Sequence, residues 1–209
     1  MRKVGVLGGT FNPIHWGHLL MAETALSQLQ LDQVVWVPTY HPPHKSPHEL
    51  LDFAHRLAMV EGAIADHPHF VVSNLESQRN RSSYAIDTLQ DLQAIYPNTQ
   101  WYWIIGLDAF QSLPRWYRLP ELANQCHWLI APRGPCHPDA QASCQKVAEQ
   151  IGCLAIQIHW QLLEMPWVGI SSSLIRSYCQ AQHSIRYLLP EAVRLYIATH
   201  HLYQADQNH

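Results

Sequence analysis

Short apolar runs that alternate with helix-like segments are the feature of this sequence that most constrains its fold. The first run, KVGVLG at residues 3–8, is apolar throughout, which is typical of a strand buried on both faces. The segment that follows places Leu19, Ala22, Leu26 and Leu29 on one face of a helix. The alternation continues along the chain, and it predicts further strands at 33–38, 70–75, 101–106, 127–132 and 154–159 and helices at 18–29, 49–66, 84–96, 138–151, 171–181 and 190–202.

This order of elements predicts an α/β fold, a Rossmann-like doubly wound parallel sheet with helices on both faces. In such sheets ligands bind at the carboxyl ends of the strands, close to the point where the strand order reverses. The 209 residues suffice for one domain with a sizeable core. We therefore expect a single domain over residues 1–203 and a frayed tail at 204–209.

Charge and cysteine content exclude several classes of protein. Charged residues make up 14% of the chain and the formal net charge is −3, which argues against binding nucleic acid through broad phosphate neutralisation. No apolar run approaches the ~20 residues of a membrane span. The five cysteines form no C-x-x-C pair, and the N-terminus runs directly into an apolar strand. These features predict a cytoplasmic protein with free thiols, whose assembly into a homo-oligomer the sequence leaves open.

The stretch GGTFNPIHWGHL, residues 8–19, joins the first predicted strand to the first predicted helix. Glycines at a strand end permit positive φ and let a ligand approach the backbone, and a helix N-terminus attracts anions. His15 and His18 are three residues apart, so both can face one ligand, with Gly17 between them. The spacing differs from the dinucleotide, Walker and H-E-x-x-H motifs. Phosphate binding, incidental packing and a metal site remain open at this point.

A second polar stretch, ISSSLIRSY at residues 170–178, stands near the other end of the chain. Serines at the start of an apolar-periodic segment cap a helix and offer hydroxyl groups. Arg176 lies one turn further on and can reach back toward an anion held at the same helix start. Taken alone, the segment also fits an ordinary N-capped helix.

Taken together, GGTFNPIHWGHL and ISSSLIR resemble the two phosphate-binding signatures of the nucleotidylyltransferase superfamily that carries the (H/T)-x-G-H motif. The stretches VPTYHPPHK, RSSYAIDTL, IIGLDAFQSLPRWYR and SIRYLLPEAVRLYI are similar to segments of its nicotinate (nicotinamide) mononucleotide adenylyltransferase branch. The resemblance spans nearly the whole chain. It implies the superfamily's nucleotidylyltransferase-type fold and adenylyl transfer from ATP, with Mg²⁺, to nicotinate mononucleotide.

The resemblance also implies roles for individual residues. His15, His18, Lys45 and Arg176 would be catalytic, and no protein residue would be a dedicated metal ligand. Trp116, which otherwise fits a core position, would stack on the pyridine ring. The implied ATP-binding residues are Gly8, Gly9, Thr10, Phe11, His18, Gly106, Asp108, Ile170, Ser171, Ser172 and Arg176, and the implied substrate-binding residues are Lys45, Tyr84, Ala85, Thr88, Trp116 and Arg133.

Two departures from the family pattern bear on the substrate. Ala85 stands where the family commonly has threonine, next to the carboxylate or amide of the pyridine ring. The segment APRGPC, residues 131–136, replaces an R-P-G pattern and makes the register of Arg133 uncertain. Three alternatives to a nicotinate-specific enzyme stay open. Ala85 permits an enzyme that prefers nicotinamide mononucleotide, and the others are a non-catalytic nucleotide-sensing relative and a metal-binding protein that uses some of the 15 histidines.

Overall fold

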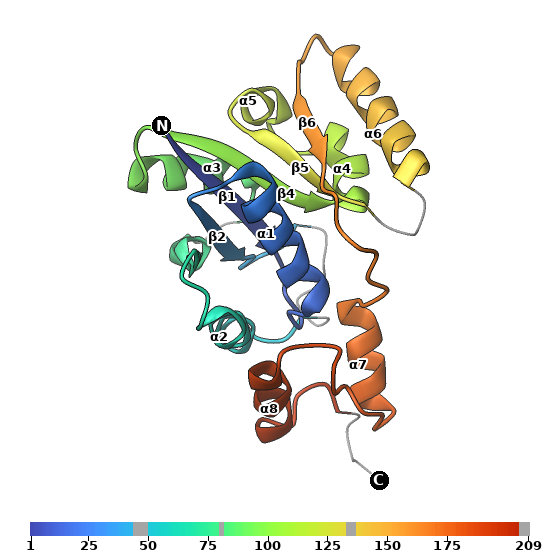
Figure 1. Ribbon diagram of the computed structural model, residues 1–209. Coiled ribbons are helices and arrows are strands. Elements are labelled where there is room, and N and C mark those ends of the chain that lie inside the picture. The colour runs from blue at the N-terminus through green and yellow to red at the C-terminus, as the bar shows by residue number, and fades with distance from the viewer. Residues whose placement is uncertain (44–49, 80–81, 133–136, 205–209) are drawn as a thin grey trace.

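A parallel six-stranded sheet forms the centre of the molecule in a computed structural model that describes residues 1–43, 50–79, 82–132 and 137–204 (Figure 1). The strand order is β3-β2-β1-β4-β5-β6, and all neighbours pair in parallel. The described elements are β1 (Arg2–Gly9), α1 (Trp16–Leu29), β2 (Gln33–Pro38), α2 (Phe53–Ile64), β3 (Phe70–Val72), η2 (Leu75–Gln78), α3 (Ala85–Ile95), β4 (Thr99–Gly106), α4 (Leu107–Ser112), η3 (Leu113–Arg115), α5 (Leu119–Ala123), β5 (His127–Ala131), α6 (His137–Gly152), β6 (His159–Leu162), α7 (Ser172–Gln180) and α8 (Glu191–Thr199).

Two apolar clusters cover the two faces of the sheet, which confirms the predicted doubly wound α/β architecture. On one face α3, α4, α5 and α6 pack against the sheet, with Phe110 and Leu122 fully buried. On the other face α1 and α2 pack against it, and α7 and α8 contribute Ile175 and Val193 to the same cluster. The strands are buried from both sides, which explains why their sequences are apolar throughout rather than alternating.

Two predicted strands end differently in the structure. β3 stops at Val72, because the chain then turns into η2 and buries Leu75 and Glu76. The last strand is not 154–159 but His159–Leu162. The apolar run from Leu154 was misread because Ala155 has a positive φ of 58° after the end of α6 and Ile156 packs back into the core. The polar edge strand β6 therefore starts where the predicted strand ended.

The chain switches from one half of the sheet to the other between β1 and β4, the neighbouring central strands. In Figure 1, α7 and α8 lie below α1, beyond the carboxyl ends of these strands. The backbone N–H of Trp16, the first residue of α1, donates to the carbonyl of Leu188 at 3.5 Å. The C-terminal helices thus approach the loop that connects β1 to α1. Within the described ranges no helix is long and apolar enough to cross a bilayer.

Candidate active site

Two cavities adjoin at the carboxyl ends of β1 and β4. The first, which we term the glycine-turn cavity, has a volume of about 420 Å³ and lies between the β1–α1 loop and the start of α7. The second, the aromatic cavity, has a volume of about 640 Å³ and lies between the β2 end, α3 and η3. The two cavities share Gly8, Ile105 and Ala109 in their walls. They occupy the place that the switch in strand order predicts.

The glycine turn differs in one respect from expectation. Gly8 and Gly9 are the last residues of β1, and the positive φ, 45°, falls on Phe11 instead. A Cβ at Gly9 would lie 3.0 Å from the ring of Phe11, so glycine is needed there to make room for that buried ring. Gly8 lines both cavities, as expected for a site where a ligand touches the backbone.

The two histidines cap the first helix with their own rings. His15 Nδ1 accepts the N–H of Gly17 at 3.1 Å, and His18 Nδ1 accepts the N–H of His15 at 3.3 Å. The sequence indicated a helix start that is open to an anion. In the structure, some of the N–H groups at this helix start are already bonded to the histidine rings. The rings stack at 3.8 Å between centroids, and both residues line the glycine-turn cavity.

This capping decides which tautomer each neutral ring adopts. A nitrogen that accepts a hydrogen bond carries no proton, so the proton of each neutral ring lies on Nε2. The capping bonds thereby turn His15 and His18 into Nε2–H donors. A Cβ at Gly17 would lie 3.0 Å from the His15 ring, so glycine at this position leaves room for that ring.

The start of α7 is hydrogen-bonded to the β1–α1 loop and forms the opposite wall of the glycine-turn cavity. Ser171 caps α7, and its Oγ accepts the N–H of Leu174 at 3.2 Å. Ser172 Oγ donates to the carbonyl of Pro13 at 2.8 Å, and Arg176 Nη1 donates to the carbonyl of Asn12 at 2.8 Å. Ser171, Ser172, Arg176 and the preceding Ile170 all line the glycine-turn cavity. The structure therefore brings the two sequence signatures together around one cavity.

A residue from the C-terminal end of the described chain joins the same loop. The hydroxyl of Tyr203 donates to Oδ1 of Asn12 at 2.7 Å, so the backbone carbonyl and the side chain of Asn12 each receive one bond from the C-terminal region. Burial raises the pKa of Tyr203 above its ordinary value, and the charges of Arg176 and Arg56 offset only part of that rise. The hydroxyl therefore stays protonated and donates at neutral pH.

The end of β4 completes the glycine-turn cavity. Gly106 is the N-cap of α4, and a Cβ there would meet nothing within 4 Å, so the space beside it is open. Asp108 lies in the first turn of α4, is exposed, and lines the same cavity. Thr10 lines it too, whereas Phe11 is buried beneath it and packs edge-on to the His18 ring at 5.1 Å. Of the predicted ATP-binding residues, Phe11 alone supports the cavity from below.

The aromatic cavity contains the predicted substrate-binding residues that the structure describes. Tyr84, Ala85, Thr88 and Trp116 line it. The indole N–H of Trp116 donates to Ser112 Oγ at 3.0 Å, and the partly buried ring packs against the core cluster and lines the cavity. Thr88 differs from expectation, because its hydroxyl donates to a buried carboxylate instead of pointing freely at a ligand: Oε1 of Glu76 lies 2.6 Å away.

Lys45 and Arg133 lie outside the described residues, as do the predicted tail residues 205–209. Sequence reasoning missed three other polar residues near the cavities, namely Arg56, Glu76 and Tyr203. The sequence could have pointed to Arg56, because its spacing from Met59 and Val60 places a charged residue on an apolar helical face. All three residues are buried in the structure. Glu76 and Tyr203 carried no such signal, since their partners lie far away in the sequence.

Metal-binding chemistry is poorly represented in the described part of the chain. No group of three or more histidine, cysteine, aspartate or glutamate side chains that could hold a metal ion lies within it. Of the residues that line the glycine-turn cavity, one is a carboxylate, Asp108, while His15, His18 and Arg176 contribute nitrogen. This lining is suited to an anion rather than to a bare cation.

Known proteins are similar to this chain in both sequence and fold. Residues 6–178 match the family model described as cytidylyltransferase-like. A protein of Trichormus variabilis named "Probable nicotinate-nucleotide adenylyltransferase" is 53% identical over 99% of both chains. A protein of the same name from Lachnoclostridium phytofermentans is 41% identical over 97% of this chain and 100% of its own.

A solved structure extends the comparison to the fold. The Plasmodium falciparum nicotinic acid mononucleotide adenylyltransferase complexed with NaAD superimposes with a TM-score of 0.77 at 19% identity, and the match covers 97% of this chain and 98% of that one. At this identity the match supports the shared fold, whereas the full-length identity to the bacterial relatives establishes the family. This chain belongs to the nicotinate-nucleotide adenylyltransferase family, within the cytidylyltransferase-like group.

Proposed function

We propose that this protein transfers the adenylyl group of ATP to nicotinate mononucleotide and releases nicotinate adenine dinucleotide and pyrophosphate. One observation carries the proposal: the glycine-turn and aromatic cavities meet at a common wall that includes Gly8. A triphosphate in the first cavity and a pyridine nucleotide in the second would bring their phosphates together at that wall. Membership of the family supports the same reaction.

In this reaction an oxygen of the acceptor phosphate attacks the α-phosphorus of ATP. The new P–O bond forms as the bond from the α-phosphorus to the oxygen bridging to the β-phosphate breaks, and pyrophosphate leaves with that electron pair. The attacking phosphate is already an anion, so no strong general base is required. The barrier arises from aligning two anions, and positioning contributes about 7–11 kcal/mol in favourable cases.

We assign the stabilisation of the transition state to fixed donors around the glycine-turn cavity. His18 Nε2–H donates to the α-phosphate as charge moves toward pyrophosphate, and His15 Nε2–H steadies the neighbouring oxygens. Arg176 keeps one nitrogen on the Asn12 carbonyl and offers its remaining N–H groups to the β- and γ-phosphates. Lys45 offsets leaving-group charge, a role that rests on its place in the sequence motif.

We propose that Mg²⁺ enters as its complex with ATP. A lining with one carboxylate, Asp108, fits an ion held by triphosphate oxygens and water better than an ion held in a protein cage. When bound, Mg²⁺ neutralises part of the phosphate charge. The residues of this chain then orient the triphosphate through the Gly9–Thr10 backbone and the start of α7.

The start of α3 supports nicotinate over nicotinamide as the acceptor. α3 spans 11 residues, and its N-cap, Tyr84, makes no side-chain capping bond. Tyr84 and Ala85 line the aromatic cavity, so the positive end of the helix dipole lies beside it. A carboxylate is stabilised there more than a neutral amide. The backbone can thus recognise the acid without the threonine hydroxyl that Ala85 lacks.

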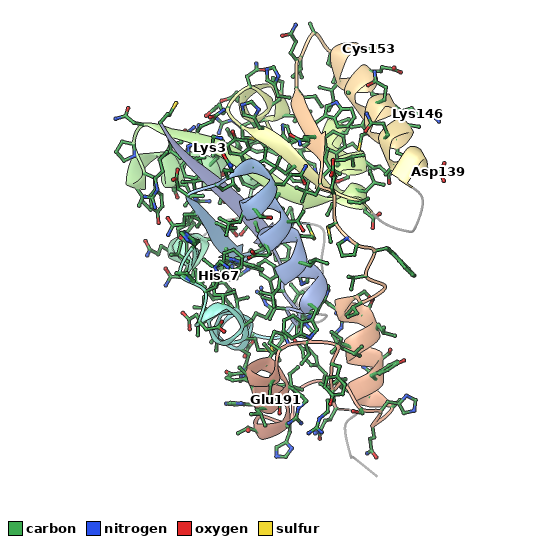
Figure 2. The ribbon with its side chains drawn as sticks, in the orientation of Figure 1. Lys3, His67, Asp139, Lys146, Cys153 and Glu191 are labelled. Atoms are coloured by element: carbon green, nitrogen blue, oxygen red, sulfur yellow. The ribbon has the colours of Figure 1, made fainter. Side chains whose placement is uncertain are left out.

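We also propose that the enzyme works in the cytoplasm. The described cysteines Cys126, Cys144, Cys153 and Cys179 are free thiols, as expected in a reducing compartment. Cys153 follows the C-terminal end of α6 and is exposed, on the part of the molecule away from α7 (Figure 2). Its oxidation state would therefore be a simple indicator of the compartment.

An acceptor panel tests the proposed function. Purified protein is supplied with ATP, Mg²⁺ and, in separate reactions, nicotinate mononucleotide, nicotinamide mononucleotide or phosphopantetheine. Pyrophosphate release is followed and the products are identified by mass. We expect turnover with both pyridine nucleotides and a higher kcat/KM with the nicotinate form. Preference for the amide would reverse the substrate assignment, turnover with phosphopantetheine alone would overturn the branch, and ATP binding without turnover would identify a sensing relative.

A further inference from the structure

Arg56 is a buried cation that lies beneath both cavities. It belongs to the first turn of α2 and is 2% exposed. Its Nε donates to the carbonyl of Leu51 at 2.9 Å, and its Nη2 approaches the carbonyl of Tyr40 at 3.5 Å. Within the described ranges its nitrogens bond to backbone oxygens and to no carboxylate. A charged side chain buried in this way needs a reason, because desolvation opposes it.

One atom of Arg56 connects the walls of the two cavities. Nη1 donates to the carbonyl of Thr10 at 2.8 Å and to the carbonyl of Thr39 at 2.7 Å. Thr10 lines the glycine-turn cavity and Thr39 lines the aromatic cavity. The strands that precede these residues are joined by a backbone bond from Thr39 to Gly9 at 2.8 Å. Arg56 continues this connection beyond the carboxyl ends of the two strands. It thereby reaches the level of the shared wall, where the two substrates would meet.

The guanidinium of Arg56 stays charged although its surroundings lower its pKa. Burial lowers its pKa from the ordinary value, whereas Tyr203, Glu76 and Asp52 raise it. An arginine retains its proton under such conditions because its ordinary pKa is so high. The ring of Phe53 lies 5.4 Å from the guanidinium carbon and covers it on one side. The fork is thus held in one orientation, with both Nη1 hydrogens engaged.

We infer that Arg56 is a positioning residue, which fixes the spacing between the ATP side and the acceptor side of the site through the carbonyls of Thr10 and Thr39. This inference rests on the proposed adenylyl transfer and adds to it a residue that touches neither substrate. A lysine could reach one of the two carbonyls, but it lacks the planar fork that holds both in fixed geometry. The feature that matters is therefore the fork and not the charge alone.

The expected consequence of losing Arg56 is misalignment rather than weak binding. Each cavity keeps its own lining residues, so ATP and nicotinate mononucleotide each still bind. The attacking oxygen and the α-phosphorus lose their fixed separation, and an error of about 1 Å can cost up to about a hundredfold in rate. We therefore expect kcat to fall at least about tenfold in Arg56→Lys and further in Arg56→Met, while both KM values change less than about threefold.

The experiment compares Arg56→Lys and Arg56→Met with wild type and with Val60→Ala. Val60 lies on the same helix and is fully buried, but it lines neither cavity, so this control is destabilised without a change at the site. In the steady-state kinetics each substrate is varied at a saturating concentration of the other, at a temperature where melting curves show the variants folded. Binding of a non-hydrolysable ATP analogue is measured separately by calorimetry.

Each outcome separates the inference from the proposed function. Turnover by wild type and Val60→Ala, with a loss of kcat alone in both arginine variants, supports the positioning role. Wild-type kcat in Arg56→Lys, a rise in one KM at unchanged kcat, or failure of both variants to fold would each overturn it, because Arg56 would then serve charge, one cavity or folding alone. Inactive wild type would instead refute the adenylyl transfer itself.

Discussion

The glycine-turn cavity and the aromatic cavity are built in contrasting ways. The glycine-turn cavity joins two ends of the chain, and hydrogen bonds that cross between them, from Ser172 to Pro13 and from Arg176 to Asn12, hold its polar walls together. The aromatic cavity draws mainly on the middle of the chain, and its lining includes Trp116 and Tyr117, of which Tyr117 is 53% exposed. One side of the site thus has a lining of polar donors, and the other has a lining rich in aromatic side chains.

This contrast indicates a division of labour between the two substrates. Phosphates carry charge and lone pairs, so a rigid set of donors recognises ATP and stabilises the charge that develops on it. A pyridine ring offers a flat face, so an indole suits it. We therefore expect changes in the glycine-turn cavity to lower kcat and changes in the aromatic cavity to raise the KM of the acceptor.

The largest effect is expected for His18→Ala. Removing a donor aimed at developing charge typically lowers kcat by about 10²–10³-fold. The variant also loses the capping bond to the N–H of His15, which costs about 1 kcal/mol of stability. Steady-state turnover together with thermal melting separates the two effects. His67→Ala, which removes a partner of Glu23 outside both cavities, serves as control, and wild-type turnover in His18→Ala would remove His18 from the mechanism.

A smaller effect is expected for Trp116→Ala, and on the other substrate. Stacking a base on an aromatic side chain is worth about 1–3 kcal/mol, so the KM for nicotinate mononucleotide should rise about tenfold to a hundredfold. The KM for ATP should stay unchanged, and Trp116→Phe should recover part of the loss. Equal rises in both KM values would show that the indole supports the core and not the acceptor, which would end the contrast drawn above.

Tyr203→Phe tests how strongly the C-terminal end supports the glycine turn. The variant removes one hydrogen bond to Asn12, and a typical neutral bond contributes about 1 kcal/mol. We expect kcat/KM for ATP to fall about threefold to tenfold while the KM for nicotinate mononucleotide is retained. Tyr187→Phe is the matched control, because Tyr187 is 83% exposed and lines neither cavity. No difference between the two variants would contradict the proposed support.

The smallest effect is expected for Ala85→Thr. The new hydroxyl would add one donor beside the ring substituent of the acceptor, at the start of α3, which already recognises a carboxylate through its backbone. We expect the ratio of kcat/KM for nicotinate over nicotinamide mononucleotide to change about threefold, as one neutral hydrogen bond allows. A change of more than a hundredfold would show that backbone recognition contributes little at this position.

The contrast between the cavities also explains what the sequence could predict. The glycine-turn cavity depends on two contiguous motifs, so the family resemblance that they carry could point to residues such as His18 and Ser171, whereas their spacing alone left several kinds of site open. The capping role of each Nδ1 could not be predicted, because it depends on ring orientation. Tyr203 and Asn12 are 191 residues apart, and no periodicity connects them. The same limit applies to Glu76, whose partner Thr88 was predicted to face the substrate instead.

The prediction of secondary structure from the sequence was limited in the same way. Buried strands such as β1 and β4 gave a strong apolar signal, because helices cover both of their faces. The edge strand β6 alternates polar and apolar residues, and the apolar run before it belongs to the packing at the end of α6. The local sequence pattern predicted the strands and helices whose apolar residues form the core. It failed where the packing partner of a residue lies elsewhere in the chain.

The most direct test of adenylyl transfer across the shared wall is a reaction with ATP labelled with ³²P at the α-phosphorus. Nicotinate mononucleotide is the acceptor, and the products are separated and counted. Attack at the α-phosphorus places all of the transferred label in nicotinate adenine dinucleotide and leaves pyrophosphate unlabelled. Label in an inorganic product, or none in the dinucleotide, would contradict the account.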